Sequence, residues 1–396
     1  MKKSTLLFVT ILISFFPFGD LFAKGKVKVD KALEHAARQY LYMRSELQGS
    51  NQFPKTYDKH MQRLKTSNSE WWCSGFYPGT LFYLYEDTGD KELYAEGVRM
   101  LKLLEPEQYN VNTHDVGFMM YCSYGNANRI APKPEYKDIM VNSARSLISR
   151  FSPVVGCIKS HNRKPDDYVV IIDNMMNLDL LFYVSHLTGD DKYKELALKH
   201  AKTTMNNHFR DDCSSYHVVS YNNDGTVEKK CTHQGQNDNS SWARGQAWGV
   251  YGYTSCYRES KDAGFLQQAK NIAALIMERV KTDDAIPLWD YDAPDISQTP
   301  RDASAASITA SAFIELSTLT EDGQIYFDYA EKLLKSLSSD VYLAKVGTNQ
   351  GFILMHSTGS LPNGSEIDTP INYADYYYLE ALLRYMQVKG IDYKNI

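Results

Sequence analysis

Apolar residues recur three or four positions apart along most of the chain, which is the spacing of one helix face. Turns such as Thr88-Gly89-Asp90 and Thr188-Gly189-Asp190 are typical of one helix ending and the next being capped. One β-hairpin is predicted from 216–220 and 226–230, around Asn222-Asn223-Asp224-Gly225. The spacing predicts twelve helices, over 29–47, 75–85, 92–104, 116–122, 136–149, 173–187, 192–205, 242–257, 265–280, 303–319, 325–337 and 373–387.

The predicted helices alternate in character. Segments 92–104 and 192–205 carry charged residues on one face, which indicates an outer position, whereas 173–187 and 242–257 are nearly apolar throughout and are expected to be buried. Short turns join partners on one side, and long Gly- and Pro-rich loops join them on the other. We therefore expect an all-α fold, an (α/α)6 six-hairpin toroid or barrel, in a single catalytic domain over residues 24–396.

The N-terminus has a different pattern. Met1-Lys2-Lys3 precedes an apolar run from Leu6 to Phe18, and Leu21-Phe22-Ala23 follows. A basic start, a short apolar core and a small residue predict a secretory signal peptide over 1–23, cleaved after Ala23. The run is too short to span a bilayer comfortably, and no Cys follows the cleavage site. We expect an exported, periplasmic protein without a membrane span.

The composition of the chain argues against some classes of partner and favours others. A net charge of −5 argues against nucleic acid as a partner. The 29 Tyr and 5 Trp suit a sugar-binding cleft, although they also suit a core. The six cysteines are far apart and show no CxxC pair and no metal-ligand spacing. Cys73, Cys122 and Cys256 are expected to be buried, and Cys213 and Cys231 are either bridged or free.

Polar and aromatic residues gather at the leading ends of the predicted inner helices. In a toroid these ends share one mouth, which is the expected place of a ligand site. The residues concerned are Trp72-Cys73-Ser74-Gly75, His114-Asp115, Asp173-Asn174, 242–246, Arg301-Asp302 with Ser304, and Asn372 with Asp375.

Asp115 and Asp173 head neighbouring inner helices and should face each other across this mouth. Paired carboxylates in a shielded site push their pKa values apart, leaving one able to act as an acid. The alternative is that both are helix N-caps. Arg244 on a largely apolar face needs an anion, either a substrate carboxylate held by two hydrogen bonds or a structural Asp.

Several of these stretches carry a resemblance. They are WCSGFYPG at Trp72–Gly79, HDVGF at His114–Phe118, DNMMNL at Asp173–Leu178, HQG at His233–Gly235 followed by WARGQAW at Trp242–Trp248, and DYYYLEA at Asp375–Ala381. In this order the chain resembles glycoside hydrolase family 88, the unsaturated glucuronyl hydrolases. The unsaturated rhamnogalacturonyl hydrolases are a related group with the same fold.

The resemblance implies an α/α barrel with no metal or cofactor. It implies a di- or oligosaccharide substrate with a 4,5-unsaturated uronic acid at its non-reducing end, as a polysaccharide lyase leaves it. Such enzymes hydrate the double bond. The position matching Asp173 acts as general acid and base, and that matching Asp115 supports charge and proton balance. By the same matching the sugar is contacted by His217, Gln234, Trp242, Arg244 and Trp248, with Trp72 and His114 lining the pocket.

Two loops bear on the choice of substrate. Many relatives carry a Trp where Lys159-Ser160 is here followed by His161, which removes one stacking face. The loop 357–365, with Ser360 and Ser365, could close over the uronate or a sulfate. Lys159, Arg163, Lys164, Lys229 and Lys230 form either a basic rim or a solvated surface.

Glycosaminoglycan fragments, either sulfated or unsulfated, are therefore the expected substrates. The alternatives are an unsaturated rhamnogalacturonyl hydrolase acting on pectin fragments, a non-catalytic sugar-binding toroid, and an ordinary inverting glycosidase acting on saturated substrates. We expect a monomer or weak homodimer.

Overall fold

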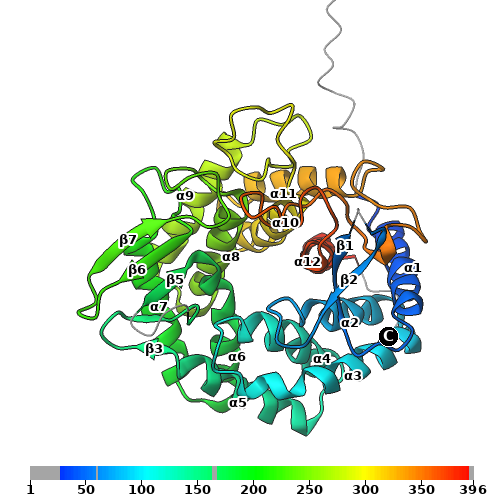
Figure 1. The fold of residues 1–396 in the computed structure, drawn as a ribbon, viewed down its shortest axis with the longest axis horizontal. Helices are drawn as coiled ribbons and strands as arrows, with labels where there is room; N and C mark the ends of the chain where they lie inside the picture. Colours follow the sequence, from blue (N-terminus) through cyan, green and yellow to red (C-terminus); the bar gives the residue numbers. More distant parts are fainter. Residues whose placement is uncertain (1–26, 59–60, 163–166, 392–396) are drawn as a thin grey trace, which may run out of the picture.

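A computed structural model describes residues 27–58, 61–162 and 167–391. The predicted signal peptide lies outside these residues. Within them, six inner helical segments stand inside six outer helices in a closed ring, which confirms the predicted (α/α)6 barrel (Figure 1). The inner segments are α2 (Phe76–Thr88), η2 (Gly117–Gly125), η3 (Ile172–Asn177) continued by α6 (Leu178–Thr188), α8 (Ala243–Ser260), α10 (Ala303–Ser317) and α12 (Asn372–Lys389). The outer helices are α1 (Val29–Leu47), α3 (Lys91–Leu104), α5 (Pro134–Ile148), α7 (Lys192–Asn207), α9 (Ala263–Arg279) and α11 (Gln324–Leu337).

Burial separates the two layers as the sequence predicts. The inner helix α10 buries 13 of its 15 residues, whereas the outer helix α3 buries only 6 of 14, on one face. The last inner helix, α12, packs against both α10 and α2 and so closes the ring. The shorter helical segments η1 (Glu105–Tyr109), α4 (Asn126–Ile130) and η4 (Asn349–Gly351) lie in the connections.

The predicted helix junctions are confirmed at two turns. Gly89 ends α2 with a φ of 66°, and the Asp90 carboxylate accepts hydrogen bonds from the backbone N–H groups of Glu92 and Leu93. Gly189 ends α6 with a φ of 71°, and Asp190 accepts from the backbone N–H of Lys192. Glycine suits both positions because residues with a side chain rarely adopt a positive φ.

Two inner helices begin differently from the prediction. The segment predicted as a helix over 116–122 is the π-helix η2, and Asp173 lies in a 3-10 turn before α6. The two segments approach closely, because the backbone N–H of Phe118 donates to Asn177 Oδ1 at 2.8 Å. A Cβ atom on Gly117 would lie only 2.5 Å from Asn177 Cα. Irregular helix of this kind is frequent at functional sites.

The strands are more numerous than predicted. The expected hairpin is confirmed as β6 (Val218–Tyr221) and β7 (Val227–Cys231), but β5 (Tyr168–Ile171) joins it as a third antiparallel strand. Two further hairpins were not predicted. They are β1 (Phe53–Asp58) with β2 (Arg63–Ser67), and β3 (Phe151–Ser152) with β4 (Cys157–Ile158).

No disulfide joins any of the six cysteines, all of which lie in the described part of the chain. Cys73, Cys122 and Cys256 are buried as predicted, and Cys213 and Cys231 are partly exposed and not bridged to each other. Among residues 27–391 where described, no helix combines the length and the apolar character that a membrane span requires.

Candidate active site

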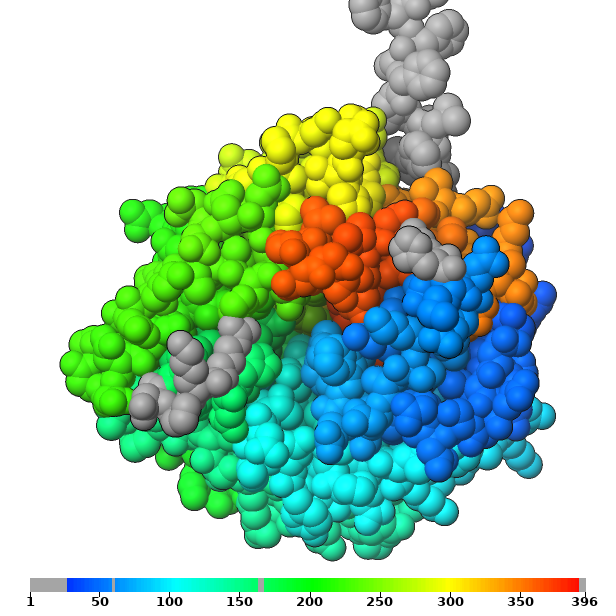
Figure 2. Space-filling model, in the orientation of Figure 1, coloured from blue at the N-terminus to red at the C-terminus, as the bar shows by residue number. Residues whose placement is uncertain are grey.

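A pocket of about 350 Å³ opens at the N-terminal ends of the inner helices. Its wall combines segments that are distant in sequence: residues near the β1–β2 hairpin, the starts of η2, η3, α8 and α12, and the loop 359–366. The face in Figure 2 is hollowed where the blue hairpin and the orange-red 350–370 region meet the green segments. Eight residues of the predicted site line it, namely Trp72, His114, Asp115, Asp173, Gln234, Arg244, Ser360 and Ser365.

Asp173 is held at the point where β5 passes into η3. Its side chain is buried, and Oδ2 has no hydrogen-bond partner among the described residues. The N-cap position of η3 is Ile171, which has no side-chain cap, so the N-cap alternative for Asp173 is wrong. Around it, Asn174 donates to the carbonyl of Ile158 and accepts from Ser160 Oγ, which ties the preceding loop to η3. Asp173 lines the pocket, and a buried carboxylate without a full set of hydrogen bonds is suited to a ligand.

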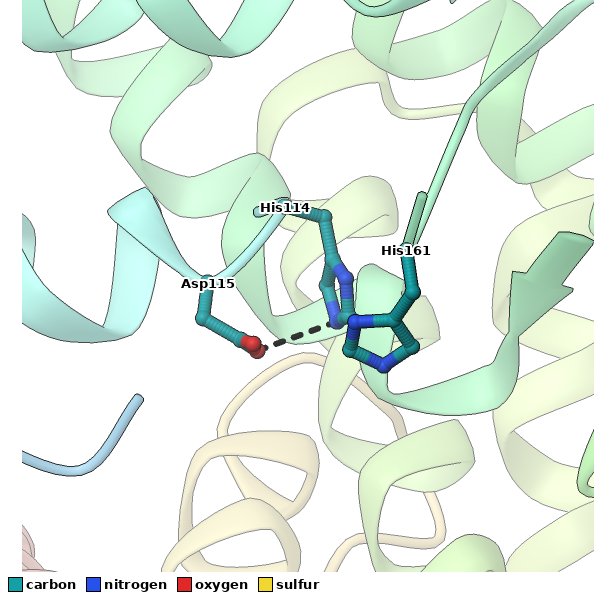
Figure 3. A group of neighbouring side chains, drawn as sticks. All are labelled: His114, Asp115 and His161. Atoms are coloured by element: carbon teal, nitrogen blue, oxygen red, sulfur yellow. Dashed lines mark ion pairs between the residues drawn. The ribbon is translucent and has the colours of Figure 1, made fainter. Parts of the chain in front are cut away.

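Asp115 has a more polar environment. Thr113 Oγ1 donates to Asp115 Oδ2 at 2.8 Å, and His114 Nε2 lies 3.0 Å from Asp115 Oδ1 (Figure 3). The Nδ1 atom of His114 contacts the carbonyl of Ser160 at 3.0 Å, so Nδ1 carries the proton. Asp115 does not cap its own helix, because its hydrogen bonds run to these side chains.

The two carboxyl groups consequently differ in pKa, as the sequence predicts. Burial raises the pKa of Asp173 to about 6, although the positive charges of His114 and Arg244 oppose the increase and Asp115 adds to it. Burial would also raise the pKa of Asp115, but the charge and hydrogen bond of His114 outweigh it and lower that pKa. Two carboxyl groups with separated pKa values can supply a proton donor and a fixed anion.

His217 presents a fixed N–H group to Asp173. Its Nδ1 atom accepts from the backbone N–H groups of His233 and Gln234, each at 3.2 Å, so in the neutral ring the proton is on Nε2. Burial lowers the pKa of His217 well below its usual value, which keeps the ring neutral. Nε2 lies 3.6 Å from Asp173 Oδ2, and Trp242 covers the ring at a centroid separation of 4.5 Å.

The contacts of Arg244 decide whether its anion is a substrate carboxylate or a structural Asp, the two alternatives that the sequence left open. Its Nη1 atom donates to Asp302 Oδ2 at 2.8 Å and to the carbonyl of Thr358 at 2.6 Å. Its Nη2 atom donates to Gln234 Oε1 at 2.6 Å and to the carbonyl of Gly359 at 2.5 Å. The structural Asp is therefore the partner, and all four Nη hydrogens are engaged. Arg244 clamps the loop over the pocket, and a two-bond grip on a substrate carboxylate does not fit this arrangement.

Other predicted residues lie behind the pocket surface. Trp248 is fully buried and packs against Phe118 and Tyr377, so it supports the wall from beneath. Asp375 turns away from the mouth and accepts from the backbone N–H groups of Ile353 and Leu354. Asn372 likewise donates to the carbonyls of Pro54 and Cys73, so the last inner helix contributes only Tyr373 to the pocket.

Some lining residues were not predicted. Lys55 lies on β1, with Nζ 3.2 Å from Glu366 Oε1 and 3.8 Å from the ring centre of Trp71. Trp71 beside Trp72 was the only sequence signal for this group. His161 also lines the pocket. Of the residues considered for a basic rim, Lys159 lies on a separate groove, and Arg163 and Lys164 fall outside the described residues.

A larger cavity of about 540 Å³ lies at the C-terminal ends of the inner helices. Each charged side chain that lines this cavity already forms an ion pair, either with another lining residue or with Glu315. Arg258 pairs with Asp179, Glu259 and Glu315, and Arg384 pairs with Glu315. Arg129 pairs with Glu86, His186 with Glu259, and Arg384 also lies near Glu380. Because the smaller pocket holds the unpartnered carboxylate, we assign the active site to it.

Comparisons with known proteins identify the family of the chain. The chain matches Glycosyl Hydrolase Family 88 over residues 45–359. It is 41% identical over 387 residues to an unsaturated glucuronyl hydrolase of Formosa agariphila, covering 94% of this chain and 96% of the relative. It is 33% identical over 343 residues to an unsaturated chondroitin disaccharide hydrolase of Streptococcus pyogenes serotype M1, covering 84% of this chain and 85% of the relative.

Solved structures give the same result. A crystal structure of an unsaturated glucuronyl hydrolase specific for heparin matches with a TM-score of 0.89 and 47% identity, over 93% of this chain and 99% of that one. The unsaturated glucuronyl hydrolase of Bacillus sp. GL1 matches with a TM-score of 0.85 and 28% identity, over 92% and 97% of the two chains. The (α/α)6 barrel, the paired carboxyl groups and these matches together show that the chain belongs to Glycosyl Hydrolase Family 88.

Proposed function

We propose that this hydrolase removes 4,5-unsaturated uronic acid from the non-reducing end of lyase-generated glycosaminoglycan oligosaccharides. The observation that carries the proposal is the buried Asp173 carboxyl group in the wall of the pocket, where Oδ2 has no hydrogen-bond partner among the described residues and burial raises the pKa to about 6. Support comes from similar proteins described as unsaturated glucuronyl hydrolases and unsaturated chondroitin disaccharide hydrolases.

The reaction begins with hydration of the C4=C5 double bond. Protonated Asp173 gives its proton to C4, and the electron pair of the double bond forms the new C–H bond. Positive charge then develops at C5 and is shared with the ring oxygen. The ionised Asp115 carboxylate stabilises this charge from a fixed position. One acid is sufficient, because Asp173 as a carboxylate then accepts a proton from the water that adds at C5.

Cleavage of the sugar linkage follows without a second acid of the usual glycosidase kind. The C5 hemiketal opens, giving a ketone at C5 and a hydroxyl on C1. The resulting hemiacetal at C1 expels the remaining sugar as an alcohol and becomes an aldehyde. His217 Nε2–H lies beside Asp173 and is available to a substrate oxygen or to the attacking water.

Loss of ultraviolet absorbance from an unsaturated disaccharide tests the proposal. Asp173→Asn should abolish the loss while the circular dichroism spectrum stays unchanged. Asp340→Asn, at an exposed position outside the pocket, is the matched control and should retain full activity. Full activity in Asp173→Asn would contradict the assignment, as would turnover of saturated substrates at a comparable rate.

A panel of substrates separates the remaining alternatives. Unsaturated disaccharides from heparin, chondroitin and hyaluronan, sulfated and unsulfated, are compared with pectin-derived unsaturated products. Preference for the pectin products would favour an unsaturated rhamnogalacturonyl hydrolase, and binding without turnover of any product would favour a non-catalytic toroid.

We also propose an exported, periplasmic location, because residues 1–23 have the pattern of a cleaved signal peptide. Fractionation of the source cells, with N-terminal sequencing of the mature chain, tests the location. A mature chain beginning at Met1 in the cytoplasm would contradict it.

A further inference from the structure

Three side chains in the active site are arranged like a set of metal ligands. His114, Asp115 and His161 each place one potential ligand atom within 4.8 Å of the others (Figure 3). The two imidazole rings are 5.0 Å apart between centroids and nearly perpendicular, at 65°. The backbone holds the segments in register through a β-bridge between Thr113 and His161. The cluster therefore belongs to the rigid frame of the pocket.

His114 is the most buried member of the cluster. The residue is 1% exposed, and its Nε2 atom meets Asp115 Oδ1 at 3.0 Å. Because Nδ1 gives its proton to the carbonyl of Ser160, neutral His114 has a lone pair on Nε2. That lone pair faces Asp115 Oδ1 at 3.0 Å, where two electron-rich atoms repel each other unless a cation lies between them. The cation is either a proton or a metal ion.

The surroundings of the cluster resemble the outer shell of a metal site. A metal-bound histidine usually donates its second N–H group to a carbonyl or carboxylate, and His114 donates to the carbonyl of Ser160. A ligating carboxylate is usually also hydrogen-bonded, and Asp115 Oδ2 accepts from Thr113 Oγ1. These bonds leave His114 Nε2 and Asp115 Oδ1, the two atoms that face each other, for an ion.

We propose that His114, Asp115 and His161 bind one divalent transition-metal ion of the Zn²⁺ class. Zn²⁺ accepts two imidazoles and a carboxylate at about 2.0–2.2 Å, leaving a fourth position for water. Such bonds place ligand atoms about 3.3–3.5 Å apart, close to the 3.0 Å between His114 Nε2 and Asp115 Oδ1. His161 is partly buried and supplies the second imidazole from the segment bridged to Thr113.

An ion in this site removes a charge that the proposed reaction uses. Asp115 is the fixed anion beside the developing positive charge, and metal coordination neutralises it. Zn²⁺ is therefore an inhibitor of the hydrolase, acting at the active site itself. Binding of the ion depends only on the three ligands, so it is measured without substrate and independently of the proposed function.

Isothermal titration with ZnCl₂ of the purified, chelator-treated chain tests the proposal, and Co²⁺ provides a visible absorbance probe for the same ligands. One ion should bind per chain. His161→Gln should weaken the affinity more than about 100-fold, and Thr113→Val, which removes only an outer hydrogen bond, about 10- to 100-fold. His186→Gln is the matched control, because His186 is exposed and pairs with Glu259 at the opposite end of the barrel.

Circular dichroism without metal checks that each variant is folded. The proposal is overturned if Zn²⁺ does not bind at one ion per chain, or if it binds wild type and His161→Gln with equal affinity. In either case the cation between His114 and Asp115 is a proton. Zn²⁺ should also inhibit the wild-type enzyme over the concentrations at which it binds. The same sensitivity in His161→Gln would overturn the site.

Discussion

His217 directs a fixed Nε2–H group at Asp173 Oδ2 across a gap of 3.6 Å. This distance exceeds that of an ordinary hydrogen bond, so the two groups are close without satisfying each other. The arrangement keeps Asp173 poorly solvated, which raises its pKa, while leaving both groups available to a bound substrate.

Replacing His217 by Asn tests this relationship. The Asn amide oxygen can take the place of Nδ1 and accept from the backbone of His233 and Gln234, but nothing replaces Nε2–H. We expect kcat to fall about 100-fold, within the range of a positioned donor, with little change in stability. His217→Gln, which places its amide nitrogen near Nε2, is the control and should retain more activity. A higher kcat in His217→Asn than in His217→Gln would contradict the proposed role of the Nε2–H group.

The pH dependence of kcat/KM should report Asp173. The proposed reaction requires this carboxyl group to be protonated, and its pKa is about 6. We therefore expect kcat/KM to decline as pH rises above about 6, approaching a tenfold loss per pH unit. Asp115, whose pKa is lowered, remains ionised over this range. A profile that instead rises between pH 6 and 8 would assign the proton to another group.

Lys55 and Glu366 offer a test of substrate choice. They form a 3.2 Å ion pair at the pocket mouth, and each side chain is 13% exposed. A sulfate on the leaving sugar must compete with Glu366 for Lys55. We expect Glu366→Gln to raise kcat/KM for sulfated relative to unsulfated disaccharides severalfold, because the amide holds Lys55 less strongly. Raising the salt concentration should reduce the difference. An unchanged ratio would place the leaving sugar away from this pair.

The sequence predicted the barrel well because periodicity reports burial. The inner helix over Ala303–Ser317 consists almost entirely of small or apolar residues, and this character assigns it to the inner layer. The η2 π-helix was not predictable, because it depends on the contact between Gly117 and Asn177, which are distant in sequence. The β1 and β2 strands lack a clear alternating pattern, since much of β2 is partly exposed.

The structure brings the acids predicted at helix starts into one pocket, but other residues that line it were not predicted. Asp115 and Asp173 were predicted because a carboxylate on a core-facing helix start is unusual. Lys55 and Glu366 were missed because their pairing joins positions that no local pattern relates. The engagement of Arg244 with Asp302 was one of two alternatives, and only the three-dimensional arrangement could decide between them.

Arg244 should be essential for both the loop and the stability of the fold. Arg244→Met leaves the fully buried Asp302 carboxylate without its counter-charge, which costs about 3–5 kcal/mol in the free energy of unfolding. Arg244→Met combined with Asp302→Asn removes both charges and should recover most of that loss. Activity should remain low in both, because the carbonyls of Thr358 and Gly359 lose their donors. Urea unfolding and kcat/KM measure the two effects. An active double variant would exclude a role for the clamp.

Asp173 should lower the stability of the enzyme at neutral pH. Burial raises its pKa in the folded protein from 3.8 to about 6, so the folded state binds the proton more tightly than the unfolded state. Below about pH 4 both states are protonated and the group has no effect. Above about pH 6 the folded state must hold a buried charge, which costs up to about 3 kcal/mol at 1.36 kcal/mol per pKa unit.

Asp173→Asn removes this cost because an amide does not ionise. The variant should therefore be inactive and yet melt a few degrees higher than wild type at pH 7, with the difference vanishing as pH falls from 6 to 4. Asp375, whose pKa burial raises to about 7, is present in both proteins and cancels in the comparison. Thermal unfolding of wild type, Asp173→Asn and Asp340→Asn at several pH values measures the effect. A lower melting temperature for Asp173→Asn at pH 7 would mean that the ionised carboxylate is satisfied by partners in the folded state, and that Asp173 is structural.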